Sequence, residues 1–510
     1  MVEKDFKIGR IVKISGLEIL FEISEADINK ISIQWNIKDY LISIHKYIFS
    51  YLPNNKKIIA RVTKIWDKEM FGDQSIYSKS DSKYLAEAHL IAIYDDYSSK
   101  LEYGINTFPI IGKDVFALTS AFYQKFLKSN SKYNIEIGNS FLDNTLKIYA
   151  NPDILFGKHL GVFGNTGTGK SCTVASLIQG IKRRLITKDD NLIKTRPKII
   201  ILDSNKEYNA AFIDAEFKVK RINKSELNLP HYFLSYTEYY KLFKASQGVQ
   251  APVLKEAIDS LKDDEGKFAL SELEEKIVEI IQEKANNNNY NYNQWYGWCS
   301  TMINRIQQIV EDERIIGIID SEGNTVDDIF DENDDSEIIL IEADFDRDEL
   351  DIIMFLLSKL IYKKIITLRE TNLLNILLVF EEAHRYINEN DINDYSLGNF
   401  YIERLAREGR KFGIGIIISS QRPSELSKTV LSQCNSFIIH RITNKNDLEF
   451  INKTLSSGNT ELLSIIPGLE KQYAVIIGEA FNYSDIIKIS TTSPTPDSAD
   501  PEVIESWLDE

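Results

Sequence analysis

The stretch GNTGTGKS, from Gly164 to Ser171, constrains the fold more than any other part of the sequence. It fits the pattern G-x-x-x-x-G-K-[ST] at every defined position, follows the apolar run LGVF and precedes a helix-like segment, CTVASLIQGIKRR. Glycines let successive backbone N–H groups surround phosphates, and the N-terminus of a helix adds the positive end of its dipole. The sequence therefore predicts a nucleotide-binding α/β domain.

Two residues of this loop have predicted chemical roles. Lys170 is expected to reach the β- and γ-phosphates of ATP, and the Ser171 hydroxyl is expected to bind Mg²⁺. ATP and Mg²⁺ are thus the predicted cofactors. The predicted nucleotide-binding residues form one continuous run: Gly164, Asn165, Thr166, Gly167, Thr168, Gly169, Lys170, Ser171 and Cys172.

A second motif, LLVFEEAHRY at residues 377–386, carries a strand-like apolar run directly into two glutamates. Adjacent carboxylates repel each other, so the arrangement costs energy unless a cation or a reaction needs it. A phosphate-bound Mg²⁺ needs a carboxylate from a neighbouring strand, and hydrolysis needs a group that orients water. We therefore predict that Glu381 is the carboxylate on the Mg²⁺ side and that Glu382 is the water-activating base.

A third motif, IERLAREGRKFGIGIIISSQRPSEL, places arginines next to another strand. Arg404, Arg407 and Arg410 recur three residues apart, which predicts that they lie near one face of a helix. Arginines that act on a neighbouring subunit's nucleotide are typical of phosphoryl-transfer enzymes, and Arg407 and Arg410 are both candidates. Gln421 ends the following strand, where it could sense the γ-phosphate.

The sequence predicts two domains followed by a tail. Residues 1–115 hold short β-rich runs with turns between them, which favours a small β-barrel for assembly or partner docking. Residues 140–490 alternate strands with helices, as in a parallel α/β sheet, with a helical insertion at about 235–330. The polar tract at 286–293 is expected to be a loop, and residues 491–510 an acidic tail.

Composition excludes several classes of protein. The N-terminus has no apolar signal segment, and no apolar run approaches the roughly 18 residues of a membrane span. Three cysteines lie far apart without a CxxC pair, and six histidines do not cluster, so neither a disulfide framework nor a zinc site is expected. We expect a cytoplasmic protein without a membrane anchor.

The net charge of −16 does not exclude a DNA partner, because the charge is unevenly spread. Residues 311–351 carry 18 Asp and Glu against two arginines, and the last twenty residues carry six acids and no base. Basic candidates for DNA contact are Lys182, Arg183, Arg184 and Arg422, although a basic run on a helix is more often simply solvated.

Taken together, GNTGTGKS, LLVFEEAHRY and AREGRKFGIGIIISSQRPSEL resemble the HerA/FtsK division of RecA-like P-loop ATPases, and HerA most closely. DSNKEY at 203–208 is similar to the family's strand-end D-x-x-x-E-Y motif, KIGRIVKISG resembles the start of its N-terminal barrel, and IPGLEKQYAVIIGEAF resembles its C-terminal hairpin. The resemblance implies Walker A roles for Lys170 and Ser171 and Walker B roles for Glu381 and Glu382. It also implies a sensor position for Gln421 and an intersubunit position for Arg407 or Arg410.

The resemblance further implies a homo-hexameric ring that threads double-stranded DNA and couples ATP hydrolysis to translocation. Such proteins work with a nuclease or another effector, for example a sirtuin-like NAD-consuming enzyme, in DNA-end processing or antiphage defence. The alternative is a ring-forming ATPase scaffold that gates its effector with little translocation. A membrane-coupled DNA pump is disfavoured because the sequence shows no spanning segment.

Overall fold

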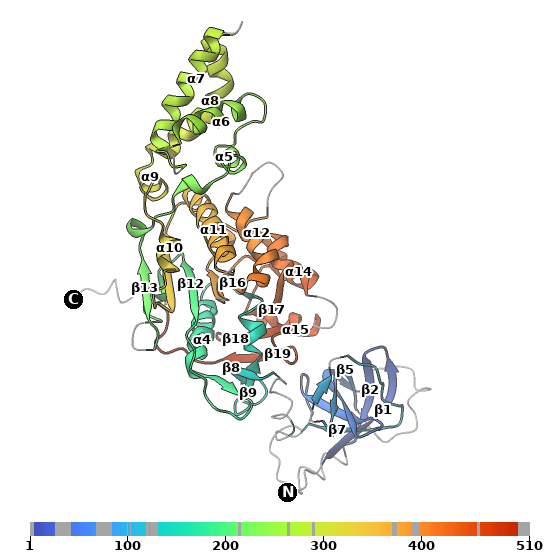
Figure 1. The fold of residues 1–510 in the computed structure, drawn as a ribbon. Helices are drawn as coiled ribbons and strands as arrows, with labels where there is room; N and C mark the ends of the chain where they lie inside the picture. The colour runs from blue at the N-terminus through green and yellow to red at the C-terminus, as the bar shows by residue number, and fades with distance from the viewer. Residues whose placement is uncertain are drawn as a thin grey trace, which may run out of the picture. The chain divides into compact units, whose positions relative to one another are not determined.

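The computed structural model describes residues 5–25, 42–67, 84–98, 100–102, 104–118, 122, 131–212, 216–262, 266–287, 291–369, 375–389, 397–455 and 460–497 (Figure 1). It divides into two compact units. The first comprises residues 1–153, 176–193 and 436–491, and the second comprises residues 154–175, 194–435 and 492–510. Within the described residues, no helix is both long and apolar enough to cross a bilayer.

The first unit contains the predicted N-terminal β-barrel. Its sheet has the order β2-β1-β7-β3-β4-β5-β6, and an added pairing of β2 with β5 closes it into a barrel that β6 extends. The neighbouring pairs for which registers are resolved are antiparallel. The strands are β1 (Phe6–Ser15), β2 (Glu18–Ile23), β3 (Tyr47–Tyr51), β4 (Lys56–Asp67), β5 (Tyr84–Asp95), β6 (Lys100–Glu102) and β7 (Asp114–Ala117).

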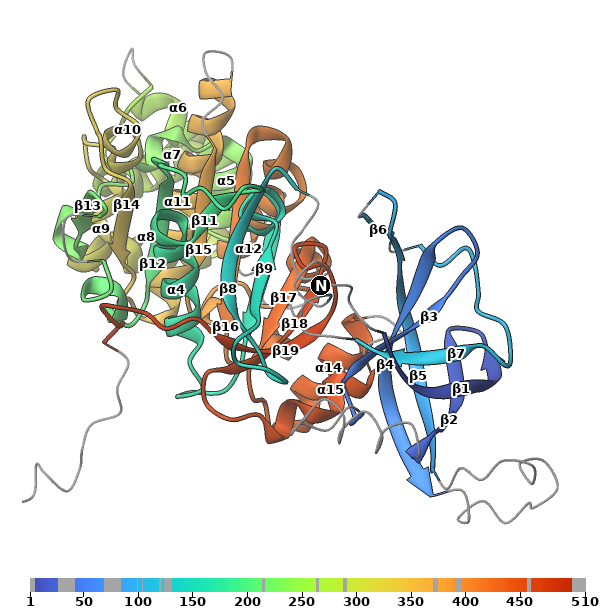
Figure 2. The same ribbon diagram turned by 90° about the horizontal axis from the view of Figure 1, so that it is seen from below.

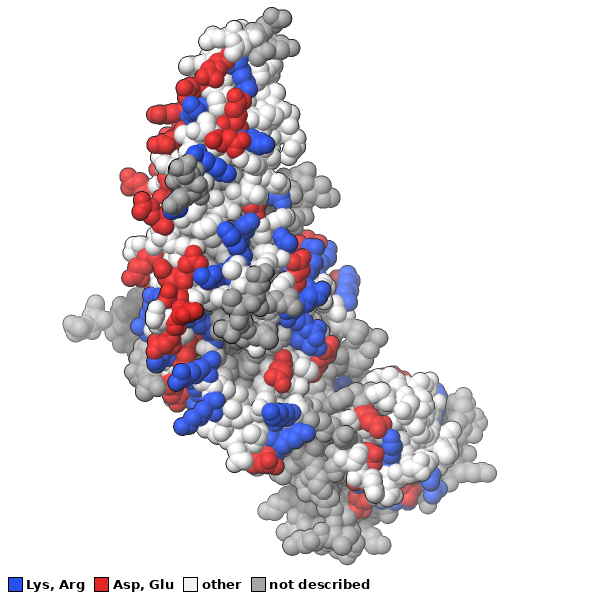
Figure 3. All heavy atoms as spheres, viewed as in Figure 1, with Lys and Arg blue, Asp and Glu red and all other residues white. Residues whose placement is uncertain are grey.

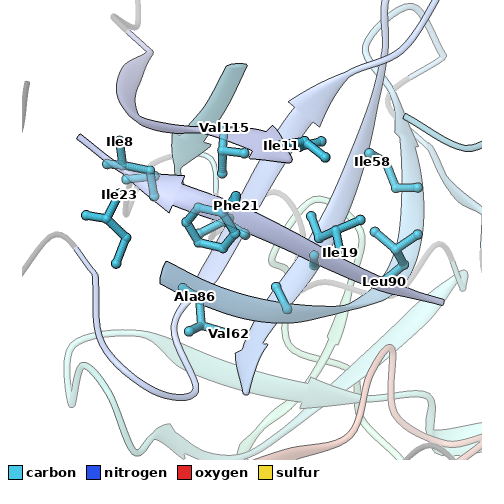
Figure 4. Packing of buried hydrophobic residues seen from close by; sticks show 14 of the residues in the cluster. Ile8, Ile11, Ile19, Phe21, Ile23, Ile58, Val62, Ala86, Leu90 and Val115 are labelled. Atoms are coloured by element: carbon cyan, nitrogen blue, oxygen red, sulfur yellow. The ribbon is translucent and has the colours of Figure 1, made fainter. Parts of the chain in front are cut away.

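The barrel interior is apolar because inward side chains alternate with outward ones along its strands. In β2, for example, Ile19, Phe21 and Ile23 are buried, whereas Glu18 is exposed. Ile8 and Val115 meet them from other strands (Figure 4). The barrel ends with β7 at Ala117, just beyond the predicted boundary near residue 115.

The first unit also contains a largely antiparallel run with the order β11-β8-β19-β18-β17, in which β9 pairs with β8 (Figure 2). The predicted C-terminal hairpin is β18 paired with β19. The strands are β8 (Tyr133–Ser140), β9 (Lys147–Ala150), β11 (Leu185–Thr187), β17 (Cys434–Ile439), β18 (Tyr473–Gly478) and β19 (Asp485–Ile489). The helices α14 (Lys445–Thr454) and α15 (Thr460–Ile465) lie between β17 and β18 in the chain.

The second unit holds a parallel sheet with the order β10-β16-β15-β12-β14-β13. Its central strands are rich in Ile, Leu and Val, because parallel strands are covered on both faces. Its strands are β10 (His159–Phe163), β12 (Lys198–Asp203), β13 (Val219–Ile222), β14 (Ile338–Glu342), β15 (Ile376–Phe380) and β16 (Ile414–Ser420). The predicted α/β core is therefore confirmed.

Helices surround this sheet and form the insertion. Flanking or connecting helices are α3 (Pro152–Leu155), α4 (Lys170–Arg183), α11 (Arg347–Arg369), α12 (Gly398–Glu408) and α13 (Lys428–Ser432). The insertion consists of α5 (Tyr236–Leu242), α6 (Gln250–Leu261), α7 (Leu273–Asn287), α8 (Tyr292–Glu311), α9 (Glu313–Ile319) and α10 (Thr325–Ile329). Its described residues are largely helical, and α6, α7 and α8 pack together (Figure 1).

Acidic side chains gather on one side of the second unit. Figure 3 shows Asp and Glu over the region of α9 and α10, which belong to the acid-rich stretch at residues 311–351. Several of these acids are paired with lysines; Asp334, for instance, binds Lys198 at 2.9 Å and Lys220 at 2.7 Å. The net negative charge is thus concentrated locally, as the sequence indicated.

Candidate nucleotide-binding and catalytic site

The candidate site lies at the carboxyl edge of the parallel sheet. The paired ends are Phe163 of β10 with Ser420 of β16, and Phe380 of β15 with Leu202 of β12. Because all these strands run in the same direction, the residues that follow them emerge at one edge. That edge receives the phosphate loop, Glu381 and Glu382, Gln421 and the DSNKEY segment, which are separated by up to about 260 residues in the chain.

The phosphate loop connects β10 to α4, which begins at Lys170. Gly167 and Gly169 have φ values of 71° and 108°, which side-chain-bearing residues rarely adopt, so the loop needs glycine there. The Lys170 ammonium donates to the Asn165 carbonyl at 3.2 Å, across the inside of the loop. This contact holds the lysine where it can exchange the carbonyl for a phosphate oxygen.

Lys170 is 6% exposed, and its burial lowers the pKa of its ammonium. The carboxylates of Glu382, Glu381 and Glu207 oppose that shift. Lys170 is therefore within electrostatic reach of the predicted catalytic carboxylates, which brings two of the sequence motifs into one site.

Glu381 and Glu382 follow β15 and are 1% and 6% exposed. Burial, and then the charge of Glu382, raises the pKa of Glu381 to about 8, whereas Lys170 acts in the opposite direction. Glu382 has a left-handed backbone conformation with φ 45°, which is costly for a residue with a side chain and is typical of functional sites. The doubled carboxylate is thus an electrostatically strained arrangement in the absence of a cation.

Glu382 is held by a chain of polar side chains. The Gln421 amide donates to Glu382 Oε1, and the Thr166 hydroxyl of the phosphate loop donates to Gln421 Oε1. His384 Nδ1 lies 3.3 Å from Glu382 Oε2, and burial lowers the pKa of this imidazole. Gln421, which sequence analysis placed as a sensor, therefore connects the phosphate loop with the predicted base.

Two contacting residues, His384 and Tyr208, were not identified as site residues from the sequence, and a third, Thr166, was predicted for a different contact. His384 lies against Glu382, Thr166 bonds Gln421, and the Tyr208 hydroxyl donates to Glu381 Oε2 at 3.1 Å. Thr166 was predicted only as a nucleotide contact. The D-x-x-x-E-Y resemblance pointed to the Tyr208 segment, but no pattern in the sequence shows which side chain it contacts.

The arginine cluster differs from the prediction in one respect. Helix α12 ends at Glu408, so Arg404 and Arg407 lie on the helix whereas Arg410 lies on the 3₁₀ turn Gly409–Phe412. Arg404 pairs with Glu408 at 3.4 Å, and Arg407 pairs with Glu403 at 2.8 Å. The Arg410 side chain is exposed, and its guanidinium makes no hydrogen bond or ion pair with the described residues.

The basic candidates for DNA contact are largely engaged within the protein. Arg184 donates to the Ser176 hydroxyl at 2.8 Å, and Arg183 donates to Gln179 at 3.3 Å. Arg422 pairs with Glu425 at 2.9 Å but is otherwise well exposed. These contacts do not identify a DNA-binding surface.

The residues at the sheet edge fit a Mg²⁺–nucleotide complex. Glu381 offers a buried carboxyl group whose pKa is raised by burial and by the charge of Glu382, and Ser171 follows Lys170 at the start of α4. Within the described residues no cluster of three or more His, Cys, Asp or Glu side chains could hold a metal alone.

The fold is that of the P-loop ATPases, with a RecA-like core. The fold is similar to that of VirB4 of Thermoanaerobacter pseudethanolicus, with 13% identity, a TM-score of 0.51 and coverage of 72% of this chain and 98% of that chain. It is also similar to the plasmid coupling protein TrwB in complex with the ATP analogue ADPNP, with 12% identity, a TM-score of 0.50 and coverage of 75% and 94%.

Sequence comparison shows similarity to HerA helicases. Residues 135–361 match the family model "Helicase HerA, central domain". A probable helicase of Methanocaldococcus jannaschii is 27% identical and aligns over 87% of this chain and 90% of its own length. The DNA double-strand break repair helicase HerA of Sulfolobus acidocaldarius is 28% identical and aligns over 73% of this chain and 72% of its own length. The resemblance to the HerA family is thereby confirmed.

The raised pKa of Glu381 predicts an unusual pH dependence of stability. In the unfolded chain this carboxyl deprotonates near its ordinary value of 4.5, whereas in the folded, nucleotide-free protein it keeps its proton until about pH 8. The free energy of unfolding therefore falls as pH rises between these values. Glu381→Gln should stabilise the nucleotide-free protein by about 2–4 kcal/mol at pH 8 and by much less at pH 5.

Chemical denaturation of the wild type and of Glu381→Gln at about pH 5 and about pH 8 measures this difference in the free energy of unfolding. Glu272→Gln, which removes an exposed carboxylate of the insertion, is the control and should change stability little at either pH. A Glu381→Gln variant no more stable than the wild type at pH 8 would show that the carboxyl is not under electrostatic strain.

Proposed function

We propose that this protein is an ATP-dependent double-stranded DNA translocase of the HerA type that works as a hexameric ring. The observation that carries the proposal is the convergence of the phosphate loop, Glu381, Glu382 and Gln421 at one sheet edge. The names of HerA relatives, DNA double-strand break repair helicases, support the DNA substrate. The structure of TrwB with an ATP analogue supports the nucleotide.

Each residue has a distinct part in the proposed reaction. The loop N–H groups and Lys170 bind the phosphates, and Ser171 and Glu381 hold Mg²⁺, which would neutralise charge on the transferred phosphoryl group. Glu382 orients the attacking water and accepts its proton. Gln421 lies between Thr166 and Glu382, so a γ-phosphate at the loop competes for the same polar groups and changes how the base is held.

We further propose Arg410, rather than Arg407, as the arginine that acts on the neighbouring subunit's nucleotide. Arg407 is paired along its own helix with Glu403, which itself accepts a hydrogen bond from Ser427 at 2.7 Å. Arg410 is exposed and makes no such contact in the part of the chain that the structure describes. A free guanidinium on a turn can reach a ligand without first breaking an ion pair.

The proposed ring acts with an effector protein. We propose a nuclease or an NAD-consuming enzyme as that effector, with the N-terminal barrel as its docking site, in DNA-end processing or antiphage defence. A ring that only gates its effector would use the same ATPase site, so coupling to DNA is the property that separates the two functions.

Hydrolysis of ATP should depend on DNA and on salt. Linear double-stranded DNA should stimulate steady-state ATP hydrolysis, and the DNA concentration for half-stimulation should rise steeply between about 50 and 200 mM salt, because phosphate contacts release counterions. Glu382→Gln should bind ATP normally but lose roughly 10²-fold or more in turnover at either salt concentration. Hydrolysis indifferent to DNA would favour the scaffold, and near-normal turnover by Glu382→Gln would remove Glu382 as the base.

The arginine proposal predicts a difference between two variants. Arg410→Ala should lower ATP hydrolysis of the assembled ring by roughly 10³-fold or more without weakening nucleotide binding, because the arginine acts on the transition state. Arg407→Ala, which removes a surface ion pair from the same cluster, is the matched control and should have a much smaller effect. Equal losses in both variants, or a loss only in Arg407→Ala, would contradict the assignment.

A further inference from the structure

Tyr208 is a fully buried tyrosine beside the candidate catalytic carboxylates. It lies in the 3₁₀ turn Glu207–Asn209 that follows β12, the strand paired with β15. Its hydroxyl donates to Glu381 Oε2 at 3.1 Å. Burying a phenol hydroxyl away from water is costly unless it finds a partner, so the fold holds this hydroxyl on the carboxylate.

Asp203, the last residue of β12, fixes the turn that carries Tyr208. Its two carboxylate oxygens accept the backbone N–H groups of Glu207 at 3.1 Å and of Tyr208 at 2.9 Å. Asp203 is 2% exposed, so these bonds form away from competing water. On the other side of the turn, the backbone N–H of Asp497 donates to the Glu207 carbonyl at 2.8 Å.

The backbone of Glu381 is also held by hydrogen bonds, as is the turn Glu207–Asn209 that carries Tyr208. Its carbonyl oxygen accepts the Ser204 hydroxyl at 3.2 Å and the Tyr386 hydroxyl at 2.9 Å. With the main chain held in this way, the rotation of the carboxylate decides where its oxygens point. The bond from Tyr208 to Oε2 favours one rotation of the carboxylate, and the nearby Ser419 hydroxyl is a second polar group that acts on it.

We propose that Tyr208, held by Asp203, is a positioning residue that orients the Glu381 carboxylate for nucleotide-bound Mg²⁺. Hydrogen-bond partners of a metal-binding carboxylate set its direction, and their removal typically weakens metal binding roughly 10- to 100-fold. Tyr208 touches neither nucleotide nor metal in this role and acts through Glu381. The inference rests on the proposed function of Glu381 as the Mg²⁺-side carboxylate.

The test compares nucleotide affinity with and without Mg²⁺. Tyr208→Phe removes only the hydroxyl, and the dissociation constant of a fluorescent ADP analogue is measured in Mg²⁺ and in EDTA. The wild type should bind more tightly in Mg²⁺ than in EDTA, and the ratio of the two dissociation constants is the Mg²⁺-dependent gain in affinity. Tyr208→Phe should reduce this gain roughly tenfold while leaving the affinity in EDTA unchanged. Asp203→Asn weakens the hydrogen bonds that hold the turn carrying Tyr208, so it should also reduce the Mg²⁺-dependent gain in affinity.

Tyr239→Phe is the matched control. Tyr239 is also fully buried, and its hydroxyl bonds His231 in the insertion, with both contacts at 2.9 Å, so its loss should leave the Mg²⁺-dependent gain intact. Thermal unfolding confirms that each variant is folded. If Tyr208→Phe does not fold, the Mg²⁺-dependent gain measured for Asp203→Asn tests the inference instead.

A Mg²⁺-dependent gain equal to that of the wild type in Tyr208→Phe would overturn the inference. So would an equal loss of affinity in Mg²⁺ and EDTA, because that would indicate a damaged phosphate loop. A wild-type protein that binds nucleotide no better with Mg²⁺ would instead overturn the proposed function, so the two failures are distinguishable.

Discussion

Two adjacent buried carboxylates, Glu381 and Glu382, with the Lys170 ammonium in electrostatic reach, are the constraint on which the rest of the site depends. A buried pair of like charges is stable only when it is neutralised by a proton or a cation. The parallel sheet brings the phosphate loop to the same edge, so a Mg²⁺–nucleotide complex can supply that cation. The nucleotide-free protein carries an electrostatic cost that binding would relieve.

The site is also organised by hydrogen bonds between strand ends. Tyr208 after β12 bonds Glu381 after β15, and Gln421 after β16 bonds Glu382 and the phosphate-loop residue Thr166. Each strand end therefore contributes one group that orients a group on its neighbour. Because these contacts link groups that follow β10, β16, β15 and β12, a change at the phosphate loop can alter how Glu382 is held.

The sequence predicted those parts of the site that depend on local chemistry. The phosphate loop, the strand that ends in two glutamates and the helical insertion all follow from residue order and apolar periodicity. Tyr208 and Glu381 are 173 residues apart, so their contact depends on the order of strands in the sheet, which local patterns do not reveal. The three-residue spacing of the arginines suggested one helix, whereas α12 ends before Arg410. Closure of the barrel by β2 and β5 is likewise a long-range pairing.

Translocation itself is the central claim, and displacement of a triplex-forming oligonucleotide from linear double-stranded DNA measures it most directly. A ring that moves along the duplex should strip the third strand in an ATP-dependent reaction, and Glu382→Gln should fail to do so while still binding ATP and DNA. ATP hydrolysis by the wild type without displacement of the third strand would contradict a motor and would leave an ATPase that gates its effector.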